Sequence, residues 1–254
     1  MADYPRIITP RHIEPVPRRI RAVHGDTVLF DSSNALYVWE WAYYPQYYIP
    51  RRDVREDLLV PDVQVEVSPG TTIRAYSFAD GGPEGPPVAR LIVDSETVKV
   101  VDTFRFEWDS LDAWFEEDEE VFVHPRNPYS RVDALRSTRV VRIELDGVVL
   151  AESASPVMVF ETGLPTRYYL NRTEVRFDHL EFSPTVTRCP YKGTTTAYWS
   201  VVIGDARHED LAWSYHFPTR ELLPIAGLVA FYNEKVDVFV DGELEPRPVT
   251  HFSD

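Results

Sequence analysis

One short stretch of this chain carries two chemically capable side chains, Cys189 and Lys192, within the sequence Cys-Pro-Tyr-Lys-Gly. Pro190 stiffens the approach to them and Gly193 permits a tight turn. A nearby ammonium favours thiolate over thiol, which prepares a cysteine to act as a nucleophile. The same ammonium on a glycine turn also suits a carboxylate or phosphate. The stretch is thus a candidate for catalysis or for anion binding, set against the usual fate of a free cysteine as a small buried hydrophobe.

Aromatic residues are dense around this stretch, and strand aromatics usually belong to a core. A small module cannot bury all of them, so those left at a concave surface would form a stacking wall for a planar ligand. Catalysis would also need a proton shuttle, for which His208 and His216 are candidates without a spacing that fixes either against Cys189. The expected ligand-binding residues are Tyr169, Arg172, Tyr191, Lys192, Trp199, Trp213 and Tyr215.

The chain repeats itself. Residues 28–32 match 149–153 and residues 51–59 match 172–180, both at an offset of 121. After a gap the match resumes, with Ala75-Tyr76 set against Ala197-Tyr198. An ungapped match over many positions points to two tandem domains of about 120 residues, a size that supports a core of its own. The Pro-rich segment 124–130 suits a linker, so we expect domains at 1–126 and 127–254.

The two copies differ at the motif. Aligned through Gly70 and Gly193, the first copy has Glu-Val-Ser-Pro-Gly where the second has Cys-Pro-Tyr-Lys-Gly, and Arg90 faces Trp213. The second copy is therefore expected to be the equipped one and the first a degenerate one, although duplicates also drift without consequence. Glu161 and Arg172 recur in the first copy as Glu40 and Arg51, which favours a buried ion pair that organises the fold. The two copies are expected to pack as an intramolecular pseudo-dimer within a monomer.

Most segments are typical of strands. Asp146-Gly147 is a two-residue hairpin signal, and residues 157–160, 167–170 and 197–203 are aromatic or β-branched. Only 172–180 and 219–225 suggest short helical turns. With 21 Pro against 11 Gly, few windows remain for a long helix. We expect an all-β protein with short helices, built of two tandem domains.

One set of residues in the second copy carries a family resemblance: Asp146-Gly147, 161–169, the motif 189–193, Tyr198-Trp199, 212–215 and Phe231-Tyr232. With these residues the second copy resembles the domain-of-unknown-function family 427, called nucleotidyltransferase-like in some naming. The resemblance implies a small β-rich fold similar to β-tent domains, without a settled activity, and no nucleotidyltransferase metal motif is present. β-Tent relatives hold zinc through paired Cys-x-x-Cys knuckles, which a chain with one cysteine cannot form.

Charge and composition exclude several classes. The 254 residues include 26 Lys and Arg against 41 Asp and Glu, a net charge of −15 that would repel nucleic acid and acidic membranes. One cysteine excludes an internal disulfide framework, and no bound metal or cofactor is expected. Neither a signal peptide nor a run of about 20 apolar residues is visible, which favours a cytoplasmic protein.

Three functions follow as hypotheses. The first is a binding site in the second copy for a small, planar, anionic molecule. The second is an enzyme that uses Cys189 or Lys192 on such a ligand. The third is a structural or scaffolding role without a ligand.

Overall fold

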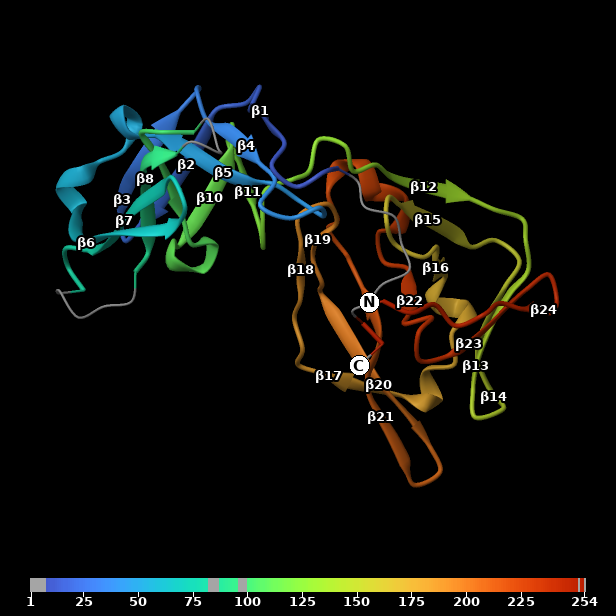
Figure 1. Cartoon of the computed structure of the whole chain (residues 1–254). Coiled ribbons are helices and arrows are strands. Elements are labelled where there is room, and N and C mark those ends of the chain that lie inside the picture. Colours follow the sequence, from blue (N-terminus) through green and yellow to red (C-terminus); the bar gives the residue numbers. More distant parts are fainter. Residues whose placement is uncertain (1–7, 82–86, 96–99, 251, 254) are drawn as a thin grey trace. The chain divides into compact units, whose positions relative to one another are not determined.

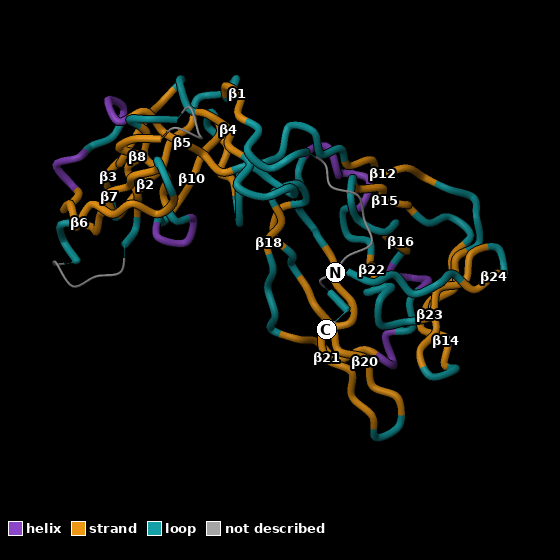
Figure 2. The backbone as a smooth tube through the Cα atoms, viewed as in Figure 1, coloured by secondary structure: helices purple, strands orange, loops and turns teal. Residues whose placement is uncertain are grey.

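The computed structural model describes residues 8–81, 87–95, 100–250 and 252–253. The chain divides into two compact units, which we call the first unit (residues 8–128) and the second unit (from residue 129 onward). Strands account for most of the regular structure of each unit, and the helices are short 3-10 turns (Figures 1 and 2). The prediction of an all-β protein with short helices in two similar halves is confirmed.

The first unit contains two antiparallel sheets. In the seven-stranded sheet the order is β1 (Ile13–Pro15), β4 (Leu36–Val38), β5 (Gln46–Pro50), β9 (Thr103–Phe106), β8 (Ala89–Ser95), β7 (Thr71–Phe78) and β6 (Leu59–Ser68). In the four-stranded sheet it is β11 (Glu119–Val121), β10 (Ala113–Glu116), β2 (Ile20–His24) and β3 (Thr27–Ser32). The 3-10 turns are η1 (Arg51–Asp53), η2 (Glu56–Leu58) and η3 (Trp108–Ser110).

The second unit repeats this plan. Its seven-stranded sheet has the order β12 (Val132–Arg136), β15 (Val157–Glu161), β16 (Arg167–Leu170), β22 (Val229–Phe231), β21 (Ala206–Ser214), β20 (Ala197–Ile203) and β17 (Leu180–Ser183). Its four-stranded sheet has the order β14 (Val148–Ser153), β13 (Val141–Leu145), β23 (Asp237–Val240) and β24 (Glu243–Leu244). The remaining elements are η4 (Arg172–Glu174), η5 (Phe177–His179), η6 (Arg220–Ile225), and the short strands β18 (Arg188–Cys189) and β19 (Gly193–Thr194).

Local sequence explains the turns that the two units share. Asp146 and Gly147 both have positive φ, 50° and 78°, as a type I′ hairpin between β13 and β14 requires. The turns η4 and η5 follow β16 just as η1 and η2 follow β5, at the offset of 121 residues seen in the sequence. A bridge between Phe30 and Val54 in the first unit recurs between Ala151 and Val175 in the second.

The strand register corrects one part of the sequence match. Leu59 pairs with Phe78 in the first unit and Leu180 pairs with Val201 in the second, so Tyr76 corresponds to Trp199 rather than to Tyr198. A slip of one residue moves a side chain to the other face of the sheet. Tyr76 and Trp199 both pack between the two sheets of their unit, which gives the physical reason for this register.

Each unit buries its main core between its two sheets, and the second unit builds an additional apolar layer on the outer face of its seven-stranded sheet. Leu222 and Ile225 of η6 cover that layer. The corresponding layer in the first unit is smaller, with Val38, Tyr48, Ile92 and Val100 as its buried members. This outer face of the second unit carries the Cys-Pro-Tyr-Lys-Gly turn.

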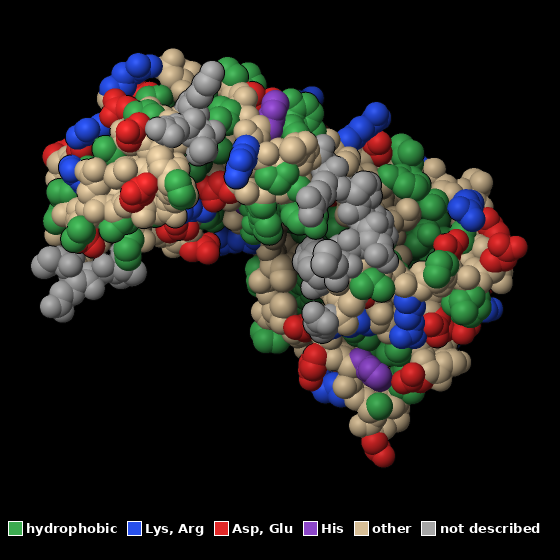
Figure 3. All heavy atoms as spheres, viewed as in Figure 1, with side chains coloured by type: hydrophobic (Ala, Val, Ile, Leu, Met, Phe, Trp, Pro, Cys, Tyr) green, Lys and Arg blue, Asp and Glu red, His purple; other side chains and the backbone are tan. Residues whose placement is uncertain are grey.

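Acidic and basic side chains are interspersed over the visible face of both units (Figure 3). Among the residues that the structure describes, no helix has the length and apolar character needed to cross a membrane. Within the same residues, no group of three or more His, Cys, Asp or Glu side chains is arranged to hold a metal ion.

Candidate functional site

The Cys-Pro-Tyr-Lys-Gly stretch forms a tight antiparallel turn. Cys189 of β18 pairs with Gly193 of β19, and Gly193 has a φ of 94°, a conformation that favours glycine. The segment before η6 fastens the turn, because the backbone N–H of Thr219 donates to the carbonyl of Lys192 at 3.1 Å and its hydroxyl donates to that of Tyr191 at 2.6 Å. The turn is thereby fixed against the outer face of the sheet.

The ammonium of Lys192 is held by a carboxylate of its own unit. Lys192 Nζ donates to Glu161 Oε2 at the end of β15, and the two side chains are only 10% and 8% exposed. Two opposite charges taken out of water together depend on each other, since removing either leaves an uncompensated buried charge. Glu161 therefore forms a buried ion pair with Lys192 and not with Arg172, the predicted partner.

The protonation of this cluster opposes nucleophilic chemistry. Burial raises the pKa of the Cys189 thiol, and the opposing effect of Lys192 is smaller. Burial alone would lower the pKa of Lys192, but the neighbouring Cys189, Glu161 and Tyr169 outweigh it and raise that pKa. Both directions favour the neutral thiol of Cys189 and the charged ammonium of Lys192 near neutral pH. They therefore oppose the formation of a thiolate nucleophile or a free amine.

Several of the predicted stacking residues form the buried layer behind this pair. Tyr169, Trp213 and Tyr215 are 0%, 6% and 4% exposed, and Trp213 Nε1 donates to the hydroxyl of Tyr169 at 3.2 Å. Burial raises the pKa of Tyr169 to about 12. Tyr191, next to Lys192 in the turn, is half-buried. These four residues lie with Lys192 on the outer side of the sheet or in the turn fixed against it.

Trp199 and Arg172 are not part of this cluster. Trp199 packs in the core between the two sheets, and the Arg172 guanidinium lies over its ring at 5.2 Å and over Phe177 at 4.9 Å. The predicted ion pair between Glu161 and Arg172 is therefore wrong, because Arg172 follows β16 on η4 at the other face. Its apolar stem and planar head stack on aromatic rings instead.

The two candidate histidines lie elsewhere. His208 Nε2 is 3.4 Å from Asp146 in the β13–β14 turn, which belongs to the four-stranded sheet. His216 is exposed, and its backbone N–H donates to Thr196 Oγ1 at 2.9 Å. In the described part of the chain no hydrogen bond joins Cys189 to either histidine.

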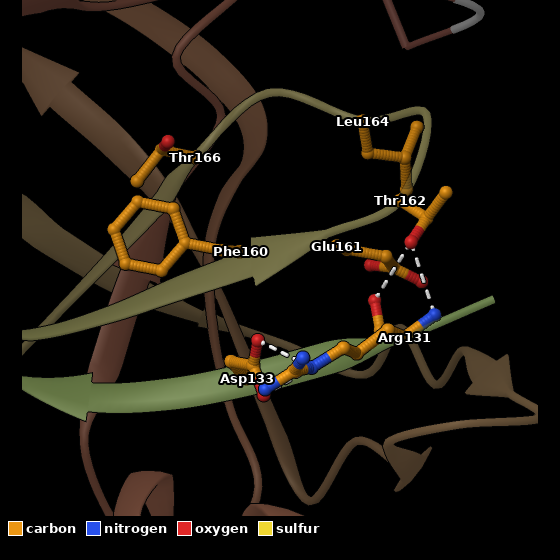
Figure 4. A pocket seen from close by; sticks show the side chains of 7 residues that line it. All are labelled: Arg131, Asp133, Phe160, Glu161, Thr162, Leu164 and Thr166. Atoms are coloured by element: carbon orange, nitrogen blue, oxygen red, sulfur yellow. Dashed lines mark hydrogen bonds and ion pairs between the residues drawn. The ribbon is translucent and has the colours of Figure 1, made fainter.

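A hollow of about 290 Å³ opens beside the ion pair, at the edge formed by β12 and β15. Figure 4 shows Arg131 leading into β12, Phe160 on β15 and the connecting loop to β16 around it. Glu161 belongs both to the lining and to the pair with Lys192. The lining residues are Arg131, Asp133, Phe160, Glu161, Thr162, Leu164 and Thr166.

Sequence reasoning missed most of this lining and a second buried ion pair. Arg167 donates to both carboxylate oxygens of Glu234 at 2.6 Å, with side chains 7% and 0% exposed, and Thr250 Oγ1 donates to the same carboxylate. The guanidinium also lies 5.9 Å from the Trp213 ring. Arg167 and Glu234 are far apart in sequence, so no local motif announces the pair. The sequence feature that could have indicated the hollow was Phe160 beside the polar segment 162–166.

The first unit has a different arrangement at the equivalent place. Glu40 follows β4 as Glu161 ends β15, and it accepts from Tyr48 Oη at 2.9 Å. Its cationic partners are Arg105 at 3.2 Å and Arg90 at 3.3 Å, both from strands of the sheet. Strand pairing confirms that Arg90 occupies the place of Trp213, because Arg90 pairs across Ala75 as Trp213 pairs across Tyr198.

Comparison with protein families gives one match, and no curated protein matches the chain. The matching family is described as a domain of unknown function (DUF427), and it covers residues 12–82 and 133–242. These two segments fall in the first and second units respectively. Together they make up more than half of the sequence, so the chain is a member of the DUF427 family that carries two tandem copies of its domain.

Proposed function

We propose that the second unit binds a small planar molecule with an anionic group in the hollow between β12, β15 and the loop that follows β15. The volume of about 290 Å³ is near the lower end of small-molecule pockets, which suits a ligand of one or two rings. The observation that carries the proposal is Arg131, because its guanidinium is the cation of the lining, while Glu161 bounds the hollow and is held from behind by the lysine of the Cys-Pro-Tyr-Lys-Gly turn.

The lining supplies the contacts that such a ligand needs. The ring of Phe160, 40% exposed, offers an apolar wall, and Thr166 offers a hydroxyl, whereas the hydroxyl of Thr162 is engaged with the backbone of Arg131. Arg131 is the cation of the hollow, and it shares its guanidinium with Asp133 at 2.9 Å. An anionic group would compete with Asp133 for Arg131, so we expect modest affinity in the native chain and a gain in Asp133→Asn.

Binding without chemistry is favoured over catalysis by Cys189 or Lys192. A catalytic role would need a thiolate or an unprotonated amine, whereas burial favours the thiol and the neighbouring acidic groups favour the ammonium. The role that we assign to Lys192 is to hold Glu161 in position. Slow labelling of Cys189 by iodoacetamide near neutral pH is expected, and rapid labelling would return the enzyme hypothesis to first place.

The binding proposal is tested by thermal shift of the full chain against nucleoside monophosphates and aromatic carboxylates. A ligand at 100 times its Kd should stabilise the folded state by about 2.7 kcal/mol. Phe160→Ala and Arg131→Gln should abolish the shift, and Asp133→Asn should enlarge it. Arg172→Ala is the control, because Arg172 stacks on Trp199 and Phe177 and does not line the hollow. No shift with any probe, or a shift that survives both hollow variants, would contradict the proposal.

A further inference from the structure

The outer edge of the seven-stranded sheet of the first unit is a long strand that the second unit does not have. β6 runs for ten residues, whereas its counterpart β17 runs for four. After β17 the second chain segment turns into Cys-Pro-Tyr-Lys-Gly, but in the first unit the corresponding segment continues as strand. β6 stands at the end of the strand order and pairs with β7 alone among the described strands (Figure 1).

This edge presents apolar side chains to solvent. Every residue of β6 after Leu59 is exposed, and Val63, Val65 and Val67 form a row of β-branched side chains that are 69%, 46% and 55% exposed. An edge strand also presents backbone N–H and C=O groups that can pair with another chain. The combination of a β-branched row and an open backbone edge is the template used in recognition by strand addition.

Two register shifts of β6, which would protect it from pairing with another strand, lie outside the middle of the strand. The register with β7 shifts between Pro61 and Gln64 and again between Glu66 and Ser68, and such bulges commonly blunt an edge. They fall towards the two ends of the strand, so regular pairing with β7 persists from Gln64 to Glu66. The regular part of this edge is therefore residues 64–66, and the segment 62–68, which we call the window, adds the bulged residues on either side of it.

The charge of the window selects the partner. Asp62 and Glu66 accept backbone N–H groups of Val63 and Gly70, at 2.6 and 3.0 Å, and no basic side chain of the described residues lies within ion-pair distance of either carboxylate. A second copy of the chain would bring the same two acids and a net charge of −15, which opposes self-pairing at this edge. A basic strand would gain from both carboxylates.

We propose that residues 62–68 of β6 dock an extended, basic, β-branched segment of another protein as an added antiparallel strand. Its apolar side chains pack on Val63, Val65 and Val67, while Lys or Arg side chains lie opposite Asp62 and Glu66. Cross-strand pairs of these kinds, together with main-chain hydrogen bonds, supply affinity and register.

The probe is the fluorescein-labelled peptide Thr-Val-Lys-Val-Thr-Val-Lys, which places its lysines opposite Glu66 and Asp62 when paired antiparallel. Fluorescence anisotropy with the full chain should show saturable binding that is at least tenfold weaker when both lysines of the peptide are glutamates. Gln64→Pro, which removes a backbone N–H that points away from β7, should weaken binding at least tenfold. Val186→Pro, at an exposed loop valine of the second unit, should not change it.

The charge-reversed variant Asp62→Lys with Glu66→Lys changes two exposed side chains, removes one local side-chain-to-backbone hydrogen bond at each, and keeps the test independent of any folding defect in Gln64→Pro. It should invert the preference, so that the glutamate peptide binds better. Absence of saturable binding, or equal binding of both peptides, would overturn the proposal. Sedimentation of the chain as a dimer that Gln64→Pro dissociates would also overturn it, because the edge would then bind a second copy.

Discussion

The two units hold equivalent carboxylates with different cations. In the second unit Glu161 meets a single ammonium that reaches it from the motif turn, whereas in the first unit Glu40 meets two guanidinium groups that stand on neighbouring strands. Arg90 occupies the place of Trp213, so the first unit gains a cation where the second has an indole. Loss of the motif therefore does not leave the first carboxylate unpaired.

The two carboxylates differ in exposure. The side chain of Glu40 is 30% exposed and that of Glu161 is 8% exposed. Removing either side chain of a buried ion pair strongly destabilises the fold, because the other charge stays buried without a partner. A half-exposed carboxylate with several donors loses less stability when one donor is removed. The difference indicates that Lys192 is the single cation that compensates Glu161. It also sets the order of the stability losses expected for the variants below.

The largest effect is expected for Lys192→Met. It leaves the Glu161 carboxylate buried without a cation, which should lower the free energy of unfolding of the second unit by about 3–5 kcal/mol. Hydrogen exchange read peptide by peptide in the full chain should show faster exchange in β15, β16 and β20. Unchanged exchange there would show that Glu161 has other support.

A smaller effect is expected for Arg105→Met in the first unit. Glu40 keeps Arg90 and the hydroxyl of Tyr48, and it reaches water, so the loss should be about 1–2 kcal/mol. The same exchange measurement on β5, β8 and β9 reports it. A loss as large as that of Lys192→Met would remove the contrast between the two units.

Alkaline pH should lower the unfolding free energy of the second unit more than that of the first. The pKa of Lys192 is raised above its ordinary value of 10.5, so the folded state keeps a proton that the unfolded state has lost, and the unfolding free energy falls as pH rises above that value. Guanidinium groups stay charged throughout this range. In the double variant Lys192→Met with Glu161→Gln, the slope of stability against pH should be shallower by up to about 1.4 kcal/mol per pH unit. Urea unfolding of the native chain and of the double variant between about pH 9.5 and about 11.5, roughly one unit on either side of 10.5, measures both slopes. Equal slopes would contradict the assignment of this pH dependence to Lys192.

The smallest effect is expected for Arg172→Ala. The guanidinium is exposed and stacked on Trp199 and Phe177, so its loss should cost less than about 1 kcal/mol. Ligand-induced thermal shifts should not change. A lost shift would place Arg172 in the binding site after all.

The secondary structure followed from the sequence where local rules decide it. Asp146-Gly147 specifies its hairpin by turn chemistry, and the aromatic and β-branched residues of β15, β16 and β20 specify strands. The single-residue slip at Tyr76 could not be found, because only pairing with β6 decides which face a side chain takes. The choice of cation for Glu161 was also out of reach, because Lys192 and Arg172 are equally plausible until the sheet places them on opposite faces.

A double-mutant cycle on Lys192→Met and Glu161→Gln tests most directly whether these two side chains form one buried unit. The unfolding free energies of the native chain, both single variants and the double variant should yield a coupling of about 2 kcal/mol or more. The double variant is therefore expected to be more stable than the sum of the single losses implies. Additive losses, to within about 0.5 kcal/mol, would show that the motif lysine does not support the carboxylate beside the hollow.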